Sequence, residues 1–525
     1  MEIELVLALG MFLAAILALL AGYPVALTLG GVALVFGLIG VQMDLIPLPI
    51  LRNLPSRILG SMENQILIAV PLFVLMGVIL ERSKVADDLL HTASRLLARV
   101  RGGLGYAVVI VGALLAASTG IVGATVITMT LIALPTMLRQ GYDPKLATGT
   151  IAASGTLGQI IPPSIVLILL ADAVSTANQA AAMRSGGGAG VVSVGDLFAG
   201  ALIPGLMLVG LYLLYLVMTA IFRPESSPAV TIDEDAEPLS IAEIMRSLGA
   251  PLLLIIAVLG SILGGLASPT EASAIGAGGA LLLAGLRLAP EHGKTGDLGS
   301  IWGAFISLLL LGLLSNTLDL TVNREAVSTL EYVGIGIAAL ASLVFLGGLL
   351  SAARVLMRAS QFTSALNSGA QITSMVFLIL IGASLFALVF RAYGGEHYVE
   401  SLLTSIPGGL WGALAITMLV MFILGFFLDF IEIVFVVVPI VAPPLIILGA
   451  DPIWLAILMA LNLQTSFLTP PFGFALFYLR GAAPDGVETM DIWRGAIPFI
   501  GLQLIMIALV AAFPALATWL PTIAG

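Results

Sequence analysis

The sequence predicts an all-α polytopic membrane protein with an inverted-repeat ion-transporter fold, containing two re-entrant hairpins and two broken helices. Hydrophobic residues make up 60% of the chain and charged residues 10%, whereas soluble domains carry roughly 25% charge. Apolar runs long enough to cross ~30 Å of hydrocarbon recur from end to end, so we expect about 11 to 14 crossings. A repeated pattern of prolines and polar residues within these apolar runs predicts the hairpins and the broken helices.

Two stretches carry the same prolines, glycines and aspartates at a constant offset of 308 residues. Each Pro-Pro pair falls where a helix should be crossing the bilayer. Proline lacks a backbone donor and clashes with the preceding turn, so each pair is expected to break its helix. Matching breaks in two halves point to the binding site of a secondary transporter. The positions are Pro135, Gly141, Asp143, Pro144, Pro162 and Pro163, matched by Pro443, Gly449, Asp451, Pro452, Pro470 and Pro471.

The first membrane half is expected over 1–222. Its opening run, 3–22, lacks a basic n-region and continues into a second apolar run, which favours a retained span over a signal peptide. The stretch 104–138 is too long for one span and is cut by small and polar residues, which predicts a hairpin. A broken helix follows at 145–178. Before the hairpin, residues 82–101 alternate leucines with five Lys or Arg residues, which predicts an amphipathic helix on the cytoplasmic membrane surface.

An acidic, proline-bearing linker at 223–247 separates the halves. The second half, 248–525, has its expected hairpin at about 409–448 and its broken helix at 453–480. Residues 288–370 add a pair of apolar runs that has no counterpart in the first half, and its purpose cannot be read from the sequence.

The half-helix ends predict the chemistry of the site. Helix N-termini present free N–H groups suited to a carboxylate, and helix C-termini and broken turns present carbonyl oxygens suited to Na⁺. Hydroxyl and amide side chains nearby would extend this coordination, although such residues also commonly join helices in membranes. They are Ser118, Thr119, Ser154, Thr156 and Ser164 in the first half and Asn462, Gln464, Thr465, Ser466 and Thr469 in the second.

Charged residues inside apolar segments are the other candidates. Asp429 and Glu432 each cost at least ~2.5 kcal/mol at the bilayer centre, so they either bind a cation or pair with Arg or backbone N–H groups that hold the hairpin closed. Arg391 is either a clamp for a substrate carboxylate or an interfacial residue whose guanidinium group extends into water. Glu271 follows Ser268 by three residues, which favours helix capping.

Several chemistries are excluded. The chain has no cysteine, and its three histidines lie far apart, so we expect neither thiolate sites nor a metal cluster. A net charge of −10 without a long basic tract argues against nucleic acid as a partner. No phosphate-binding Gly-x-x-x-x-Gly-Lys-Ser/Thr and no His-Glu-x-x-His occurs, so we expect no enzyme and no cofactor beyond a coupling ion.

These segments resemble the large membrane subunit of tripartite ATP-independent periplasmic (TRAP) transporters. The similarity covers nearly the whole chain, and the string 462–477 with 382–391 resembles the branch labelled for mannitol or chloroaromatic compounds, whose members are associated with 2-oxo acids and lactate-like carboxylates. The inserted pair at 288–370 departs from the plainer large subunits. The motifs are Gly141-Tyr-Asp-Pro, Gly158-Gln-Ile-Ile-Pro162-Pro163-Ser164, Ser268-Pro-Thr-Glu-Ala, Leu461-Asn-Leu-Gln-Thr-Ser-Phe-Leu-Thr-Pro-Pro-Phe-Gly473 and Pro514 to Pro521.

The resemblance implies an elevator mechanism, in which hairpins and broken helices slide against a scaffold and carry substrate with Na⁺. It also implies two partners, a small four-helix membrane subunit supplied by a separate chain and a periplasmic substrate-binding protein. The implied Na⁺ residues are Ser118, Thr119, Gly120, Gly158, Pro162, Asp429, Asn462, Thr465, Thr469 and Pro470, and the substrate residues are Ser154, Thr156, Ser164, Gln464 and Arg391.

The sequence therefore predicts the large permease subunit of a Na⁺-coupled importer of a small organic carboxylate, in the bacterial inner membrane. The alternative closest in mechanism is a self-sufficient Na⁺/carboxylate symporter or Na⁺/H⁺ antiporter of related fold. An ion channel and an intramembrane enzyme are the alternatives from other classes.

Overall fold

The computed structural model describes residues 2–186, 190–229, 239–321 and 328–524, and these residues contain helices but no strand. Thirteen helical stretches are long and apolar enough to cross a membrane, and two of them, Ile241–Leu263 and Phe430–Ile447, are each joined from shorter helices by a π-helical turn. Helices dominate because a backbone in lipid must satisfy its own hydrogen bonds. The predicted all-α polytopic class is confirmed.

The first half runs from α1 to α11. Its predicted first span is present as α1, and the predicted hairpin at 104–138 corresponds to α7 and α8. The bounds are α1 Glu2–Leu20, α2 Val25–Gln42, α3 Leu48–Arg52, α4 Leu54–Met62, α5 Gln65–Arg82, α6 Val85–Leu97, α7 Gly103–Thr119, α8 Val122–Arg139, α9 Pro144–Thr156, α10 Ile165–Ser185 and α11 Val194–Phe222.

The second half runs from α12 to α25, and its predicted hairpin at 409–448 corresponds to α19, α20 and α21. Part of the linker, 230–238, lies outside the described residues. The bounds are α12 Ile241–Ile244, α13 Ala250–Leu263, α14 Pro269–His292, α15 Asp297–Thr317, α16 Thr329–Arg358, α17 Phe362–Ala392, α18 Gly395–Ser405, α19 Gly409–Leu424, α20 Phe430–Glu432, α21 Val438–Ile447, α22 Pro452–Leu468, α23 Phe474–Ala482, α24 Thr489–Ala512 and α25 Ala515–Ala524.

Both predicted breaks are present. A 3₁₀ turn at 157–159 ends the first helix, and residues 160–164 stay non-helical before α10 begins at Ile165. Residues 469–473 separate α22 from α23 in the same way. The bond between the two prolines is cis in each break. In both halves an aspartate caps the helix before the break, Asp143 for α9 and Asp451 for α22.

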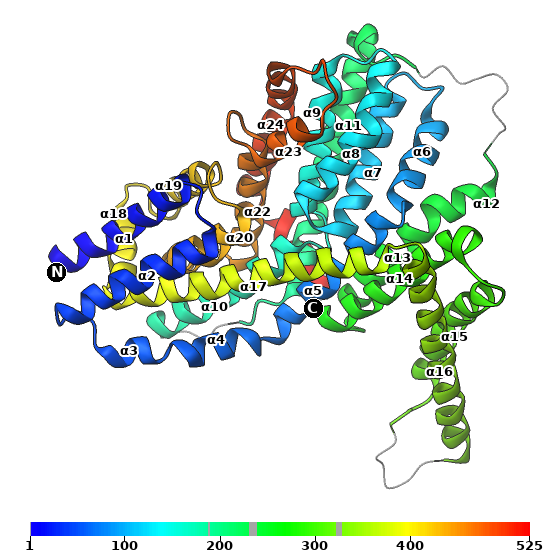
Figure 1. Cartoon of the computed structure of the whole chain (residues 1–525). Coiled ribbons are helices and arrows are strands. Elements are labelled where there is room, and N and C mark those ends of the chain that lie inside the picture. The colour runs from blue at the N-terminus through cyan, green and yellow to red at the C-terminus, as the bar shows by residue number, and fades with distance from the viewer. Residues whose placement is uncertain (1, 187–189, 230–238, 322–327, 525) are drawn as a thin grey trace.

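The two halves interlock at these breaks. The helix after the first break, α10, packs against α21 of the second hairpin, while α23 packs against α8 of the first hairpin. Figure 1 shows α7, α8 and α9 beside α22, α23 and α24, although hundreds of residues separate them in the chain. Each break is therefore built against the hairpin of the other half.

Glycines allow two of these helices to come very close together. A Cβ added to Gly495 in α24 would lie 2.1 Å from the carbonyl oxygen of Lys145, and one added to Gly149 in α9 would lie 2.1 Å from the oxygen of Gly495. Close glycine contacts of this kind are common between membrane helices. They fix α24 directly against the first broken helix.

The inserted pair forms a helical hairpin of its own. Helices α15 and α16 pack along each other and against α14, and they project away from the rest of the molecule in Figure 1. Many of their apolar side chains face outward, such as Leu309 and Leu343, which are 76% and 67% exposed. Such a surface suits contact with lipid or with another protein.

The predicted amphipathic segment forms helix α6. Helix α6 buries Val85, Ala86, Leu89, Leu90 and Ala93 and packs mainly against α7. Its apolar face is thus largely covered by the first hairpin, and its place on the cytoplasmic membrane surface stays a prediction. The capping role of Glu271 is confirmed: the Ser268 N–H donates to its carboxylate at 2.8 Å and its own N–H donates to the Ser268 hydroxyl at 3.3 Å.

Candidate functional site

The two broken helices meet at equivalent positions of the repeat. Gln464 Nε2 on α22 donates to Thr156 Oγ1 at the end of α9, at 3.3 Å, and these residues are 308 apart in the chain. This separation is the offset of the proline pattern. Equivalent positions of the two repeats are therefore in direct contact.

A third helix joins the contact. Gln503 Nε2 on α24 also donates to Thr156 Oγ1 at 3.3 Å and to the hydroxyl of Tyr212 on α11 at 2.8 Å. The Thr156 hydroxyl itself donates to the Ala153 carbonyl oxygen at 2.8 Å. All of these side chains are fully buried, and so they form a polar cluster in an otherwise apolar interior.

Several buried amide atoms near the breaks lack hydrogen-bond partners among the described residues. Neither Nε2 nor Oε1 of Gln159 makes a hydrogen bond, and Oε1 of both Gln464 and Gln503 is unpartnered. Gln159 lies in the 3₁₀ turn just before Pro162. Buried polar groups almost always have partners, so unpartnered amide oxygens in one region are typical of a site that accepts an ion, water or substrate.

The hydroxyls that the sequence singled out mostly bond to nearby backbone. Ser154 donates to the Thr150 carbonyl oxygen at 2.6 Å, and Ser164 donates to that of Gln159 at 3.1 Å. Thr465 and Thr469 donate to carbonyls one turn earlier, at 2.8 and 2.7 Å. Each hydroxyl oxygen keeps its lone pairs and can still accept or coordinate.

The first hairpin tip touches the first break. Gly120 ends α7 with a φ of +60°, and a Cβ there would lie 3.2 Å from the backbone nitrogen of Ile165, where α10 begins. Gly158 and Pro162 are buried beside it. The side chains of Ser118 and Thr119 lie outside the described residues.

The second hairpin is tied to the second broken helix. Asn462 Nδ2 donates to the Met418 carbonyl oxygen on α19 at 2.8 Å. The rings of Phe427 and Phe472 lie 5.3 Å apart, between the tip and the break that contains Pro470. Tip and break thus form one unit in each half.

Asp429 and Glu432 form a helix cap at the second tip. The Phe430 N–H donates to Asp429 Oδ1 at 2.7 Å, and the Asp429 N–H donates to Glu432 Oε2 at 2.5 Å. The backbone N–H alternative is therefore realised. Neither carboxylate has a Lys, Arg or His within ion-pair distance in the described part of the chain, so two neighbouring acids stay without a countercharge.

Glu432 also faces a cavity of about 720 Å³ between the second tip and the helices α2 and α17. Three polar residues of α17 line it, Asn367, Gln371 and Ser374, whose spacing places them on one face of the helix. Glu432 is 4% exposed, and its Oε1 has no hydrogen-bond partner among the described residues. The cavity therefore brings polar groups to a buried carboxylate.

Arg391 is not brought to the breaks. Its guanidinium pairs with Glu396 at 2.6 Å, and Glu396 also pairs with Arg184 at 2.6 Å. Arg184 lies in the last turn of α10, about 28 Å along that helix from its start at the break. The ion pair matches the interfacial interpretation.

Gln159, Tyr212 and Gln503 belong to the candidate site by their position, although the sequence pattern did not single them out. Nor did the pattern single out Asp172 in α10, whose Oδ1 accepts from Asn64 Nδ2 at 2.8 Å. The available signal was a polar side chain within an apolar helix, which is costly unless it has a purpose.

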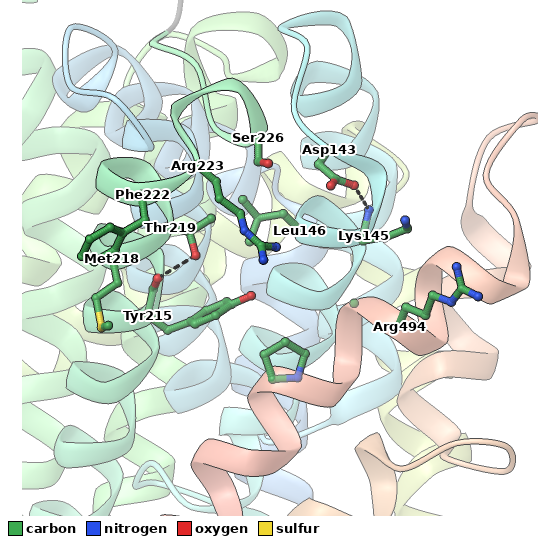
Figure 2. A pocket seen from close by; sticks show the side chains of 12 residues that line it. Asp143, Lys145, Leu146, Tyr215, Met218, Thr219, Phe222, Arg223, Ser226 and Arg494 are labelled. Atoms are coloured by element: carbon green, nitrogen blue, oxygen red, sulfur yellow. Dashed lines mark hydrogen bonds between the residues drawn. The ribbon is translucent and has the colours of Figure 1, made fainter.

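A separate pocket of about 440 Å³ lies at the outer end of the first broken helix, between the start of α9, the end of α11 and the start of α24 (Figure 2). Helix α9 has 13 residues, so the pocket is about 20 Å from Thr156. It is distinct from the breaks.

Known proteins share this sequence and fold. The family described as tripartite ATP-independent periplasmic transporter, DctM component, matches residues 11–309 and 297–516. The C4-dicarboxylate TRAP transporter large permease protein DctM of Pseudomonas aeruginosa is 29% identical over 474 residues, 90% of each chain. The DctM of Vibrio cholerae is 26% identical over 513 residues, 98% of this chain and 97% of that protein. The sialic acid TRAP transporter large permease protein SiaM of Vibrio cholerae is 24% identical over 507 residues, 96% of each chain.

A solved structure has the same fold. The YdaH transporter of Alcanivorax borkumensis superposes with a TM-score of 0.52 at 15% identity, over 97% of this chain and 98% of that chain. The predicted transporter fold and the resemblance to TRAP large subunits are confirmed, and the relatives are permeases, not enzymes. The finer branch remains a prediction. The chain is a multi-pass protein of the inner membrane and belongs to the DctM family, the large permease components of tripartite ATP-independent periplasmic transporters.

Proposed function

We propose that this chain imports a small organic carboxylate together with Na⁺, working with a small four-helix membrane subunit and a periplasmic substrate-binding protein. The observation that carries the proposal is the meeting of two broken helices around unpartnered amide oxygens. Relatives are named for C4-dicarboxylates and sialic acid, both of which carry carboxylates, which supports an organic acid as the substrate.

Helix ends supply the groups for an anion. Four helices begin at the tips and breaks: α8, α10, α20 and α23. The N-caps of α8, α10 and α23 (Ile121, Ser164 and Gly473) accept no backbone N–H through a side chain. Their first N–H groups stay available, and the helix dipole favours negative charge there. A substrate carboxylate bound at these ends would need no Arg clamp.

Oxygen atoms supply the groups for Na⁺. Helices α7, α9, α19 and α22 end at the same tips and breaks and turn their last carbonyls toward them. The Oε1 atoms of Gln159, Gln464 and Gln503 are further neutral oxygens. Asp429 and Glu432 add negative charge at the second tip, and the cavity beside Glu432, where Asn367, Gln371 and Ser374 line the α17 wall, would let a cation approach it.

Movement of the site would then carry both solutes. We propose that the two hairpins and two broken helices form the moving unit, since they interlock through α10 with α21 and α23 with α8. The scaffold would include α2 and α17, which pack on each other and border the cavity at the second tip. The Na⁺ would neutralise the acids at this tip before the unit crosses the lipid, where unpaired charge is costly.

Uptake by vesicles reconstituted with both partners tests the proposal. A panel of radiolabelled carboxylates, with and without an inward Na⁺ gradient, should give uptake that needs both the gradient and the binding protein. Full uptake without the binding protein would favour the self-sufficient symporter. Uptake without any Na⁺ dependence would refute Na⁺ coupling.

A further inference from the structure

The pocket at the outer end of α9 gathers positive charge from separate parts of the chain. Lys145 comes from the first turn of α9, Arg223 follows the last residue of α11, and Arg494 lies near the start of α24. None of the three takes part in an ion pair among the described residues. The only carboxylate in the lining is Asp143, so the pocket carries a net positive charge.

Local geometry increases the attraction for an anion. The Asp143 carboxylate is used as the cap of α9, where its Oδ1 accepts the Lys145 N–H at 2.9 Å. Lys145 adds a positive charge at a helix N-terminus, where the dipole is already positive and a basic side chain is unfavourable by itself. In Figure 2 the guanidinium of Arg223 and the hydroxyl of Tyr215 face the same hollow. An anion in this hollow would offset the charge of the basic side chains and the partial positive charge of the α9 N-terminus.

One wall of the pocket is apolar and continues onto an outward surface. Met218 and Phe222 of α11 line it and are 49% and 75% exposed. Leu214 and Ile221 extend the same exposed apolar surface, at 55% and 67%. A free inorganic anion would make no use of this wall, whereas a molecule with a charged head and hydrocarbon chains would.

The pocket also lies at a surface of the membrane protein where basic residues outnumber acidic ones. The Asp143 N–H donates to the Ser226 carbonyl oxygen at 3.1 Å and the Gly102 N–H donates to that of Ser227 at 3.1 Å, so three chain segments share this surface. Those segments contain the basic residues Arg99, Arg101, Arg139, Lys145 and Arg223 and the acidic residues Asp143 and Glu225, so basic residues are in excess. Basic residues at helix ends concentrate on the cytoplasmic side, where anionic lipids attract them.

We propose that this pocket binds the phosphate of an anionic phospholipid of the cytoplasmic leaflet, with Lys145 and Arg223 as its main charged contacts and with the acyl chains lying along α11. The site is separate from the breaks and does not depend on the transported substrate. A bound lipid would hold the ends of α9, α11 and α24 together at the membrane surface.

Native mass spectrometry of the full-length protein in detergent tests the proposal. Phosphatidylglycerol, phosphatidylcholine and inorganic phosphate would each be titrated onto the wild type and onto a Lys145→Gln/Arg223→Gln variant. We expect phosphatidylglycerol to bind best, and the double variant to lose about fivefold in affinity for each basic residue removed. The matched control is Arg101→Gln/Arg139→Gln, which removes two charges from the same surface outside the pocket and should lose less than twofold.

Three outcomes would overturn the proposal. Equal losses in the pocket variant and the control would mean general surface attraction. Equal binding of phosphatidylcholine would mean that charge is not recognised. Competition by inorganic phosphate at the same concentration as the lipid would mean a free-anion site. Arg494→Gln serves as a second pocket variant if the double variant fails to fold.

Discussion

Replacing Asp429 with asparagine removes one negative charge from the second hairpin tip and keeps its helix cap. The Phe430 N–H donates to Asp429 Oδ1 at 2.7 Å, and asparagine offers an oxygen at the same position. Asparagine caps helices as well as aspartate does, so the tip should keep its geometry. The substitution therefore changes the charge of the acid pair and little else.

The size of the effect follows from Coulomb's law. Two unit charges 4 Å apart interact by about 1 kcal/mol in water and about 4 kcal/mol at an effective dielectric constant of ~20. Asp429 is half-buried, which places a bound Na⁺ between these limits. At about 1.4 kcal/mol for each factor of ten, the Na⁺ concentration for half-maximal uptake should rise at least about fivefold.

Asp451→Asn is the matched control for this variant. Asp451 is an exposed N-cap whose Oδ1 accepts the Trp454 N–H at 2.9 Å, at the start of α22 and away from the tip. Uptake in reconstituted vesicles over a Na⁺ titration gives the half-maximal concentration for both variants. If Asp429→Asn leaves it unchanged, or if Asp451→Asn shifts it equally, Asp429 does not hold the coupling ion.

Two further predictions concern packing and the ion pair at the end of α17. Gly495→Ala should lower the free energy of unfolding by about 1–3 kcal/mol, because its Cβ would lie 2.1 Å from the Lys145 carbonyl oxygen and the helices must separate. The control is Gly501→Ala on the same helix, whose Cβ would meet nothing within 4 Å. Equal melting temperatures of the two variants in detergent would contradict the packing argument. Arg391→Ala should leave the substrate concentration for half-maximal uptake within about twofold. It should lower stability by at most about 1 kcal/mol, since it breaks a half-exposed ion pair with Glu396. A tenfold rise in that substrate concentration would support the substrate-clamp interpretation instead.

The positions of the helix breaks and helix starts could be predicted from the sequence because their causes are local. A Pro-Pro pair removes backbone donors wherever it stands, and an aspartate followed by proline starts a helix through its own side chain. These rules placed the breaks near Pro162 and Pro470 and the helix starts at Pro144 and Pro452, as the structure has them. Long apolar runs likewise determined the membrane class.

The hydrogen-bond and ion-pair partners of the polar side chains could not be predicted from the sequence, because they depend on how distant helices pack. Sequence spacing could mark Gln464 and Thr156 as equivalent, but only the interlocking of the halves brings them to 3.3 Å and adds Gln503. The same packing leaves Gln159 without a partner among the described residues and brings Arg184 to Glu396, the residue that also pairs with Arg391. The sequence by itself therefore determined where the helices break, since backbone chemistry acts within one turn. Tertiary structure decided which side chains face those breaks, since that depends on contacts between residues hundreds of positions apart.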